Sequence, residues 1–364
     1  MSRMVRYESL DVVRGFAALS VVIAHTTSAV LIDNPDIWKW LEWSPLRFLF
    51  AGHQAVIMFF VLSGFALTVM IKSIPKYNYT KYITARIIRL WPPYAASILL
   101  TIAIVNLLKM FNLEWYNGWS GIAPFDMEKS DIIGNLTMLG VFNPFSINPP
   151  IWSLIQEMRV SIIFPLILFM VMKYNIKALI CFILISIICC VYFKGTMYAN
   201  LALAKDSYIF TASFFSPFAL GCFIAINIER ILNTISSYST GKVWVIFLIS
   251  YTIYSYSFSR PWSATARLVG DIIISLSSAI MLCVSLKIKD GIFMKIGKYL
   301  GKISYSLYLT HISVLTVLMT TLYKTHTPFI VWVLMLPASI LLADIFTRTI
   351  DRLSINFSRK IYKR

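Results

Sequence analysis

Charged residues are scarce in this sequence. Only 13% of its 364 residues are Asp, Glu, Lys or Arg, whereas 58% are hydrophobic, and the mean hydropathy is +0.74. A soluble protein of this length would carry about twice that charged fraction. The apolar residues also occur in long blocks, and roughly 20 apolar residues suffice to cross the hydrocarbon core of a bilayer. The composition excludes an ordinary soluble protein and predicts an all-α integral membrane protein.

Cysteine is also rare, and this limits the classes of site that the chain can build. All five cysteines lie inside apolar blocks, and none falls in a predicted external loop: Cys181, Cys189, Cys190, Cys222 and Cys283. An odd number of cysteines in such positions argues against a disulfide framework and against a metal site. We expect small buried hydrophobic residues, and no metal.

Acidic residues number only 16 against 33 basic ones, which gives a net charge of +17. Such an excess can indicate nucleic-acid binding, but here the basic residues are dispersed between apolar blocks, so no nucleic-acid partner is expected. About ten blocks can span a lipid bilayer, namely residues 12–32, 54–71, 92–108, 152–172, 177–193, 207–228, 243–258, 268–286, 303–323 and 328–347.

The distribution of Lys and Arg predicts the orientation of these spans. With the N-terminus inside, the inner segments hold 23 basic residues and the outer segments hold 9. This bias predicts that both termini are cytoplasmic. The apolar stretch 132–142 is too short to cross, so we expect a re-entrant or interfacial segment. Residues 1–347 then form one membrane domain, and residues 348–364 form a basic cytoplasmic tail on the anionic inner leaflet.

The first span carries ionisable residues on one face. At 100° per residue, Asp11, Arg14 and His25 point to similar sides, and His25 lies about 16 Å along the axis from Arg14, near mid-membrane. Asp11 is about 21 Å from His25 by helix rise, so it more plausibly pairs with Arg14. Gly15 on this face would permit close helix packing. Alternatively, Arg14 reaches to the inner surface and His25 is a hydrogen-bonded core residue. Intramembrane ionisable groups are more often functional.

Two arginines precede the third span. Arg86 and Arg89 are one helical turn apart, and Pro92 and Pro93 follow. Because proline suits a helix start and disfavours an unbroken helix, we expect the arginines on a short interfacial helix of their own. Two guanidinium groups at this spacing suit phosphate, although plain positive-inside anchoring would also explain them.

The fourth span begins with a polar cluster. Trp152 and Ser153 precede Gln156, and the Ser–Gln spacing reads as a capping box. Glu157 lies one turn into the helix, where capping does not require it. It is therefore the better functional candidate.

The ninth span carries a second mid-membrane histidine. Ser304, Tyr308 and His311 share one face, with Tyr305 beside them, and His311 lies about 12 Å from the inner end. A polar ladder for helix packing would also explain this pattern. Taken together, two histidines, one acid and an arginine cluster suit a site supplied with an anionic ligand from the cytoplasm.

The chain resembles the acyltransferase 3 family of membrane O-acyltransferases over most of its length. The resemblance rests on five motifs in the family's order: Ser9-Leu10-Asp11-Val12-Val13-Arg14-Gly15 with His25; Phe59-Phe60-Val61-Leu62-Ser63-Gly64-Phe65; Arg86-x-x-Arg89 with Pro92; Trp152-Ser153-Leu154 with Glu157-Met158-Arg159, Ser161, Phe164 and Pro165; and Ser304-Tyr305 with Tyr308-Leu309 and His311. The resemblance implies transfer of an acyl group, most often acetyl from acetyl-CoA, to hydroxyls of cell-surface or secreted glycans. It also implies a bacterial cytoplasmic membrane and roles for His25, Arg14, Arg86 and Arg89.

The expected site follows from these residues. Arg86 and Arg89, with Arg14, would pair the phosphates of acetyl-CoA, the co-substrate. His25 would act as general base or acyl carrier, with Glu157 or His311 assisting. The acceptor would be a lipid-linked or nascent polysaccharide. A transporter or flippase for a glycan or small anionic solute is the rival interpretation, because broken helices with polar residues also suit transport. An inactive membrane scaffold is a third.

Overall fold

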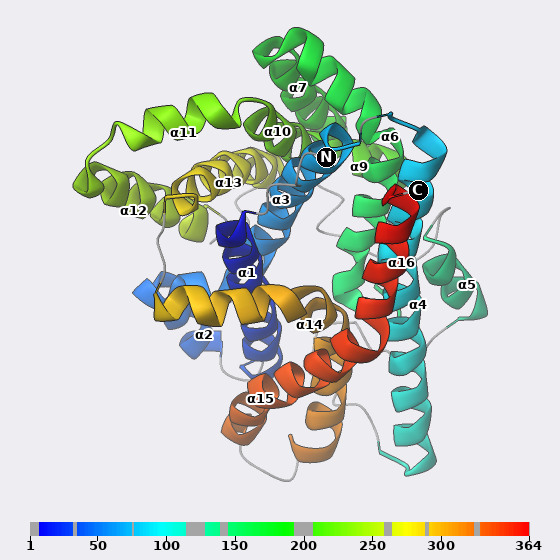
Figure 1. Cartoon of the computed structure of the whole chain (residues 1–364). Coiled ribbons are helices and arrows are strands. Elements are labelled where there is room, and N and C mark those ends of the chain that lie inside the picture. Colours follow the sequence, from blue (N-terminus) through cyan, green and yellow to red (C-terminus); the bar gives the residue numbers. More distant parts are fainter. Residues whose placement is uncertain are drawn as a thin grey trace. The chain divides into compact units, whose positions relative to one another are not determined.

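A computed structural model describes residues 7–31, 35–74, 76–113, 128–138, 145–192, 207–257, 264–287, 291–323 and 328–363. Within these ranges the regular elements are all helical, which confirms the all-α prediction for the described residues (Figure 1). In chain order they are α1 (Glu8–Val30), α2 (Pro35–Trp43), η1 (Pro45–Phe50), α3 (Gly52–Lys72), α4 (Tyr79–Met110), α5 (Lys129–Thr137), η2 (Pro149–Ile151), α6 (Trp152–Tyr174), α7 (Ile176–Tyr192), α9 (Ser207–Ser213), α10 (Phe215–Ile226), α11 (Ile228–Ser236), α12 (Thr240–Tyr256), α13 (Ala264–Ser285), α14 (Ile292–Leu322), α15 (Pro328–Phe346), η4 (Thr347–Asp351) and α16 (Arg352–Lys363).

Apolar helices dominate the described chain. Seven of them are long and apolar enough to cross a membrane, and two shorter apolar helices cover Ile176–Val191 and Gly270–Ser285. This agrees with a multi-pass membrane protein. The predicted total of ten spans and the cytoplasmic termini stay predictions. The predicted segment 132–142 contains the end of α5, whose nine residues are too short to cross, and its residues 139–142 lie outside the described ranges.

The chain forms two compact units, each assembled from three stretches of sequence. The first unit comprises residues 1–17, 53–82 and 159–302, and the second comprises residues 18–52, 83–158 and 303–364. Five described helices, α1, α3, α4, α6 and α14, contribute residues to both units, although α3 contributes only Gly52 to the second.

Helices of the first unit approach closely at glycines. A Cβ atom on Gly15 of α1 would lie 2.6 Å from the backbone nitrogen of Gly301 and 2.7 Å from the carbonyl oxygen of Gly297, both in α14. A Cβ on Gly64 of α3 would lie 2.1 Å from the carbonyl oxygen of Phe218 in α10. Only glycine allows backbones to come this near, so the packing role predicted for Gly15 is confirmed.

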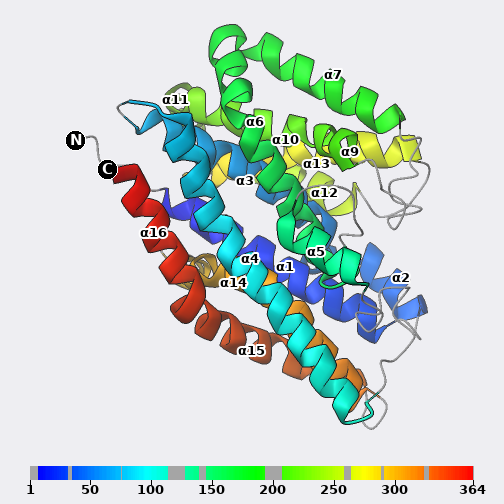
Figure 2. The same ribbon diagram turned by 90° about the vertical axis from the view of Figure 1, so that its right-hand side faces the viewer.

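In the second unit, the end of the chain packs along α4. The backbone leaves α15 through the π-helical turn η4 and changes direction into α16 (Figure 1). Figure 2 shows α16 beside α4. The Ser358 hydroxyl donates to the Ala85 carbonyl at 2.7 Å, and the Thr347 hydroxyl donates to Ser306 of α14 at 2.7 Å. The described residues 348–363 of the segment predicted as a basic tail are therefore helical, with defined partners on α4.

Candidate functional site

Two histidines face each other in the second unit. Nδ1 of His25 on α1 lies 3.2 Å from Nε2 of His311 on α14, and the ring centroids are 5.2 Å apart at an interplanar angle of 31°. His311 is fully buried, and His25 is half-buried. The two residues are separated by 286 positions in sequence. The structure thus brings together the two histidines that the sequence placed at similar depth.

The hydrogen bonds of the pair determine its tautomers. Nδ1 of His311 lies 3.1 Å from the carbonyl oxygen of Leu307, and a carbonyl only accepts, so this nitrogen carries hydrogen. Nε2 of a neutral His311 is then an acceptor, and Nδ1 of His25 donates to it, with the Val21 carbonyl as a second acceptor for the N–H of His25. In the neutral pair this leaves the lone pair of His25 on Nε2. A ring held in that way can accept a proton at Nε2.

Hydroxyl groups lie next to the histidine pair. The Tyr308 ring centroid is 6.0 Å from that of His311, and the Tyr308 hydroxyl donates to the Pro150 carbonyl at 2.6 Å. The hydroxyl groups of Ser153 and Tyr308 form a hydrogen bond of 2.7 Å. The capping box predicted for Ser153 and Gln156 is therefore wrong, because the turn at Pro149–Ile151 already starts the helix and Ser153 contacts α14 instead. The ring centroids of Trp152 and Phe145 are 6.4 Å apart.

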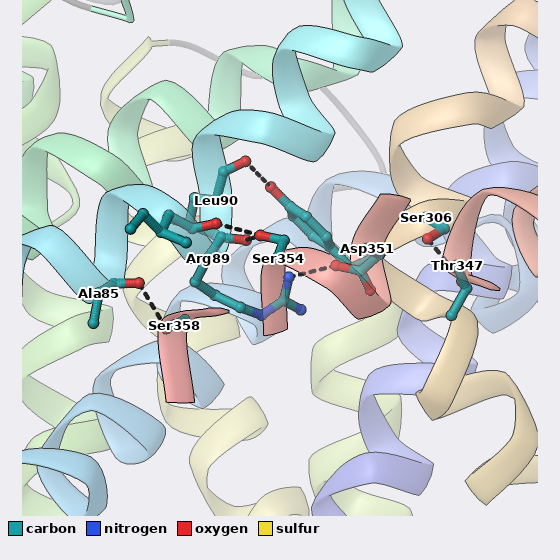
Figure 3. Close-up of polar contacts among 10 residues, drawn as sticks. Ala85, Arg89, Leu90, Ser306, Thr347, Asp351, Ser354 and Ser358 are labelled. Carbon is teal, nitrogen blue, oxygen red and sulfur yellow. Dashed lines mark hydrogen bonds and ion pairs between the residues drawn. The ribbon is translucent and has the colours of Figure 1, made fainter. Parts of the chain in front are cut away.

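Both arginines of α4 are held by carboxylates. Arg86 forms an ion pair with Glu157 of α6, and their side chains are only 13% and 14% exposed. The Arg89 guanidinium lies 2.5 Å from Oδ1 of Asp351 (Figure 3). It also lies 4.8 Å from the centroid of the Tyr305 ring. Two of the three predicted donor-binding arginines therefore belong to the second unit, together with Glu157 and Tyr305. Of the two residues expected to assist His25, His311 contacts it and Glu157 pairs with Arg86.

The prediction that Pro92 and Pro93 interrupt the helix is wrong. Helix α4 runs from Tyr79 to Met110 with both prolines inside it, so the two arginines are not on a separate interfacial helix. The prolines remove the N–H groups that would bond the carbonyls of Ile88 and Arg89. The Ser354 hydroxyl contacts both of these carbonyl oxygens, at 3.1 Å for Arg89 (Figure 3). The single hydrogen of a neighbouring hydroxyl is thus available to the two carbonyls that lack a helix donor.

The remaining arginine candidate lies in the first unit. Arg14 pairs with Asp11 at 3.2 Å, which confirms the pairing predicted from their i, i+3 spacing. The Asp11 side chain is 18% exposed and that of Arg14 is 36% exposed.

Sequence reasoning missed two carboxylates. Asp351 lies in residues 348–364, the segment that the excess of basic residues marks as a cytoplasmic tail. Asp271 of α13 lies in the first unit, where its Oδ1 is 2.6 Å from Nε2 of His53 on α3, and both side chains are about 15% exposed. The available signal was the same for both: an acid beside or within a long apolar block, which is costly unless it has a partner.

Within the described residues, no group of three or more His, Cys, Asp or Glu side chains is arranged to hold a metal ion. The five cysteines are free thiols in this structure. The described residues bring together a pair of imidazoles, several hydroxyl groups and two guanidinium groups, which are groups able to transfer a proton, donate hydrogen bonds and bind an anion.

Comparison with known proteins identifies the family of the chain. A family model described as an acyltransferase domain, Acyl_transf_3, matches residues 7–348, which is nearly the whole chain. No curated protein and no solved structure matches the sequence significantly.

Proposed function

The chain belongs to the acyltransferase 3 family, and we propose that it transfers an acetyl group from acetyl-CoA to a hydroxyl of a cell-surface or secreted polysaccharide. Family membership supports an acyltransferase that acts on a hydroxyl. The observation that carries the proposal is the contact between His25 and the buried His311, because it orients the His25 imidazole as a base. The enzyme would be a multi-pass protein of a bacterial cytoplasmic membrane.

The reaction proceeds by general base catalysis. Nε2 of His25 removes the proton of the acceptor hydroxyl as that oxygen attacks the carbonyl carbon of the thioester. A C–O bond forms, the tetrahedral intermediate collapses, and the C–S bond breaks. The departing thiolate takes the proton from His25 and leaves as the free thiol of CoA. A positioned base of this kind contributes about 10²–10⁴-fold, and the thioester is already an activated donor.

His311 supports this step through the same hydrogen bond. When His25 gains a proton, its Nδ1–H still donates to Nε2 of His311, and that bond strengthens because the donor is now charged. The Leu307 carbonyl holds His311 in the tautomer that accepts. The alternative is that His25 attacks the thioester itself and carries the acetyl group before the acceptor arrives. Both routes need the lone pair on Nε2.

The donor enters from the cytoplasm in this proposal. Arg86 and Arg89 bind the phosphates of acetyl-CoA, since guanidinium groups bind phosphate through two parallel hydrogen bonds. Each of the two arginines is already paired with a carboxylate, which fixes its place before the donor arrives. The acceptor is a lipid-linked or nascent polysaccharide.

The test is the transfer of label from radioactive acetyl-CoA to polysaccharide in membranes that contain the full-length protein. We expect His25→Ala to lower the transfer rate at least 100-fold. Phe16→Ala changes a 38% exposed residue of the same helix and should retain the rate of the unaltered protein. NMR of the surface polysaccharide should lose its O-acetyl signal in cells that carry His25→Ala.

Two results would contradict the proposal. Transfer at the native rate by a folded His25→Ala protein would remove the base from the mechanism. Movement of a solute across the membrane without covalent labelling of any glycan would identify a transporter instead.

A further inference from the structure

The C-terminal helix lies outside the matched family domain but contacts its arginine motif. The family match ends at residue 348, whereas Asp351, Ser354 and Ser358 follow it. All three bond to α4: Asp351 to the Arg89 side chain, Ser354 to the Ile88 and Arg89 carbonyls, and Ser358 to the Ala85 carbonyl (Figure 3). Residues 349–363 are thus attached to the helical turn that presents Arg89.

Asp351 is placed where an unpaired carboxylate would be unfavourable. Its side chain is 2% exposed, and a buried charge is tolerated only with a partner and hydrogen bonds. The partner is the Arg89 guanidinium at 2.5 Å. Asp351 is the last residue of the π-helical turn η4, and such turns shift the register of the side chains that follow them.

A second contact holds the other side of Arg89. The guanidinium carbon lies 4.8 Å from the Tyr305 ring centroid, within the range of a cation–π interaction. The ring is itself fixed, because the Tyr305 hydroxyl donates to the Leu90 carbonyl at 2.8 Å. Arg89 is therefore held between a carboxylate and an aromatic face, both of them anchored.

The guanidinium keeps hydrogen-bond donors for a ligand. It has five N–H groups, and Asp351 is contacted through one terminal nitrogen. The Arg89 side chain remains 27% exposed. An arginine that is fixed in place but still exposes donors is suited to an oxyanion such as a phosphate ester.

The geometry points to Asp351 as a positioning residue that orients Arg89 toward a phosphate of the acyl donor. This inference rests on the proposed function, since it takes acetyl-CoA as the ligand. A side chain that is already immobilised loses less conformational entropy when the ligand binds. Removal of Asp351 should therefore weaken acetyl-CoA binding about 2- to 10-fold, which corresponds to the ordering of one long side chain.

The experiment compares two probes on the purified full-length protein. Acetyl-CoA carries phosphates, whereas acetyl-pantetheine has the same thioester without them. We expect Asp351→Ala to raise the Kd of acetyl-CoA about 2- to 10-fold and to leave the Kd of acetyl-pantetheine unchanged. A merely structural role would weaken both probes alike. Asp351→Asn keeps the size and an acceptor oxygen, so it should give a smaller rise, and it carries the test if Asp351→Ala does not accumulate.

Two further variants separate the possible outcomes. Ser358→Ala removes a bond between α16 and α4 without touching Arg89, so its acetyl-CoA affinity should equal that of the unaltered protein. Arg89→Gln should weaken acetyl-CoA binding, and adding Asp351→Ala to it should have no further effect.

The results that overturn the inference differ from those that overturn the function. If Arg89→Gln weakens acetyl-CoA binding but Asp351→Ala does not, only the positioning role fails. If Asp351→Ala tightens acetyl-CoA binding, Asp351 competes with the phosphate and the inference is wrong. If Arg89→Gln changes neither affinity, Arg89 does not bind the donor, and both this inference and that part of the proposed function fail.

Discussion

A backbone carbonyl fixes the tautomer of one of the two facing histidines. The Leu307 carbonyl accepts a hydrogen bond from Nδ1–H of His311, so Nε2 of His311 accepts a hydrogen bond from His25. Many catalytic bases are oriented by a carboxylate behind the histidine. Here a second, fully buried imidazole occupies that position. Such a partner does not add a negative charge inside the membrane domain, where an isolated carboxylate would be costly.

A second histidine contact, between His53 and Asp271, yields a prediction about stability. Because the pair is about 85% buried, we expect His53→Gln or Asp271→Asn alone to lower the free energy of unfolding by about 1.5–3 kcal/mol. The double variant should lose less than the sum of the two single losses, since neither partner is then left alone. Denaturant unfolding in detergent measures all three.

The exposed pair of Lys39 and Asp36 is the matched control. These side chains lie 3.1 Å apart but are 71% and 90% exposed. Lys39→Gln should change the free energy of unfolding by at most about 1 kcal/mol, because surface pairs contribute little. If the double variant of His53 and Asp271 loses as much free energy of unfolding as the two single variants together, the two side chains do not interact energetically.

At the scale of elements, helix α4 depends on its neighbours to remain continuous. Pro92 and Pro93 leave two carbonyls without helix partners, and the Ser354 hydroxyl from α16 contacts both. The Trp91 indole and the Tyr94 hydroxyl add contacts to carbonyls at the end of α5, at 2.7 and 2.8 Å. Side chains of neighbouring helices thus contact the part of α4 in which the prolines remove two helix hydrogen bonds.

This arrangement predicts that Ser354 and the prolines are energetically coupled. Ser354→Ala should lower the free energy of unfolding by about 0.5–1.5 kcal/mol, because it leaves freed carbonyls without a donor. In a protein that also carries Pro92→Ala and Pro93→Ala, the restored N–H groups can bond those carbonyls, so the same Ser354→Ala change should cost less. Thermal unfolding of the four proteins measures the coupling. An equal loss in both backgrounds would mean that Ser354 does not replace the missing helix bonds.

At the scale of the whole molecule, the unequal distribution of Lys and Arg predicts the topology. If 23 basic residues face the cytoplasm and 9 face outward, both termini are inside. A fluorescent protein fused after Arg364 should then fluoresce, and alkaline phosphatase at the same place should be inactive. Phosphatase fused after Leu113, beyond α4, should be active. Active phosphatase at the C-terminus would reverse the predicted orientation or change the number of spans.

The sequence by itself determined the apolar helices and which ionisable side chains lie within them. Long apolar blocks need no partner to be recognised, because the thickness of a bilayer sets their length. The pairing of Asp11 with Arg14 and the close packing at Gly15 were also predictable, since both follow from spacing along one helix. Local periodicity contains this information.

Only the tertiary structure decided which ionisable groups meet. His25 and His311 are 286 positions apart, and Arg89 and Asp351 are 262 positions apart. The periodicity of one helix shows which residues share a face, but not which other helix covers that face. For the same reason the prolines of α4 were misinterpreted: whether a missing N–H ends a helix depends on a hydroxyl supplied by Ser354, far along the chain.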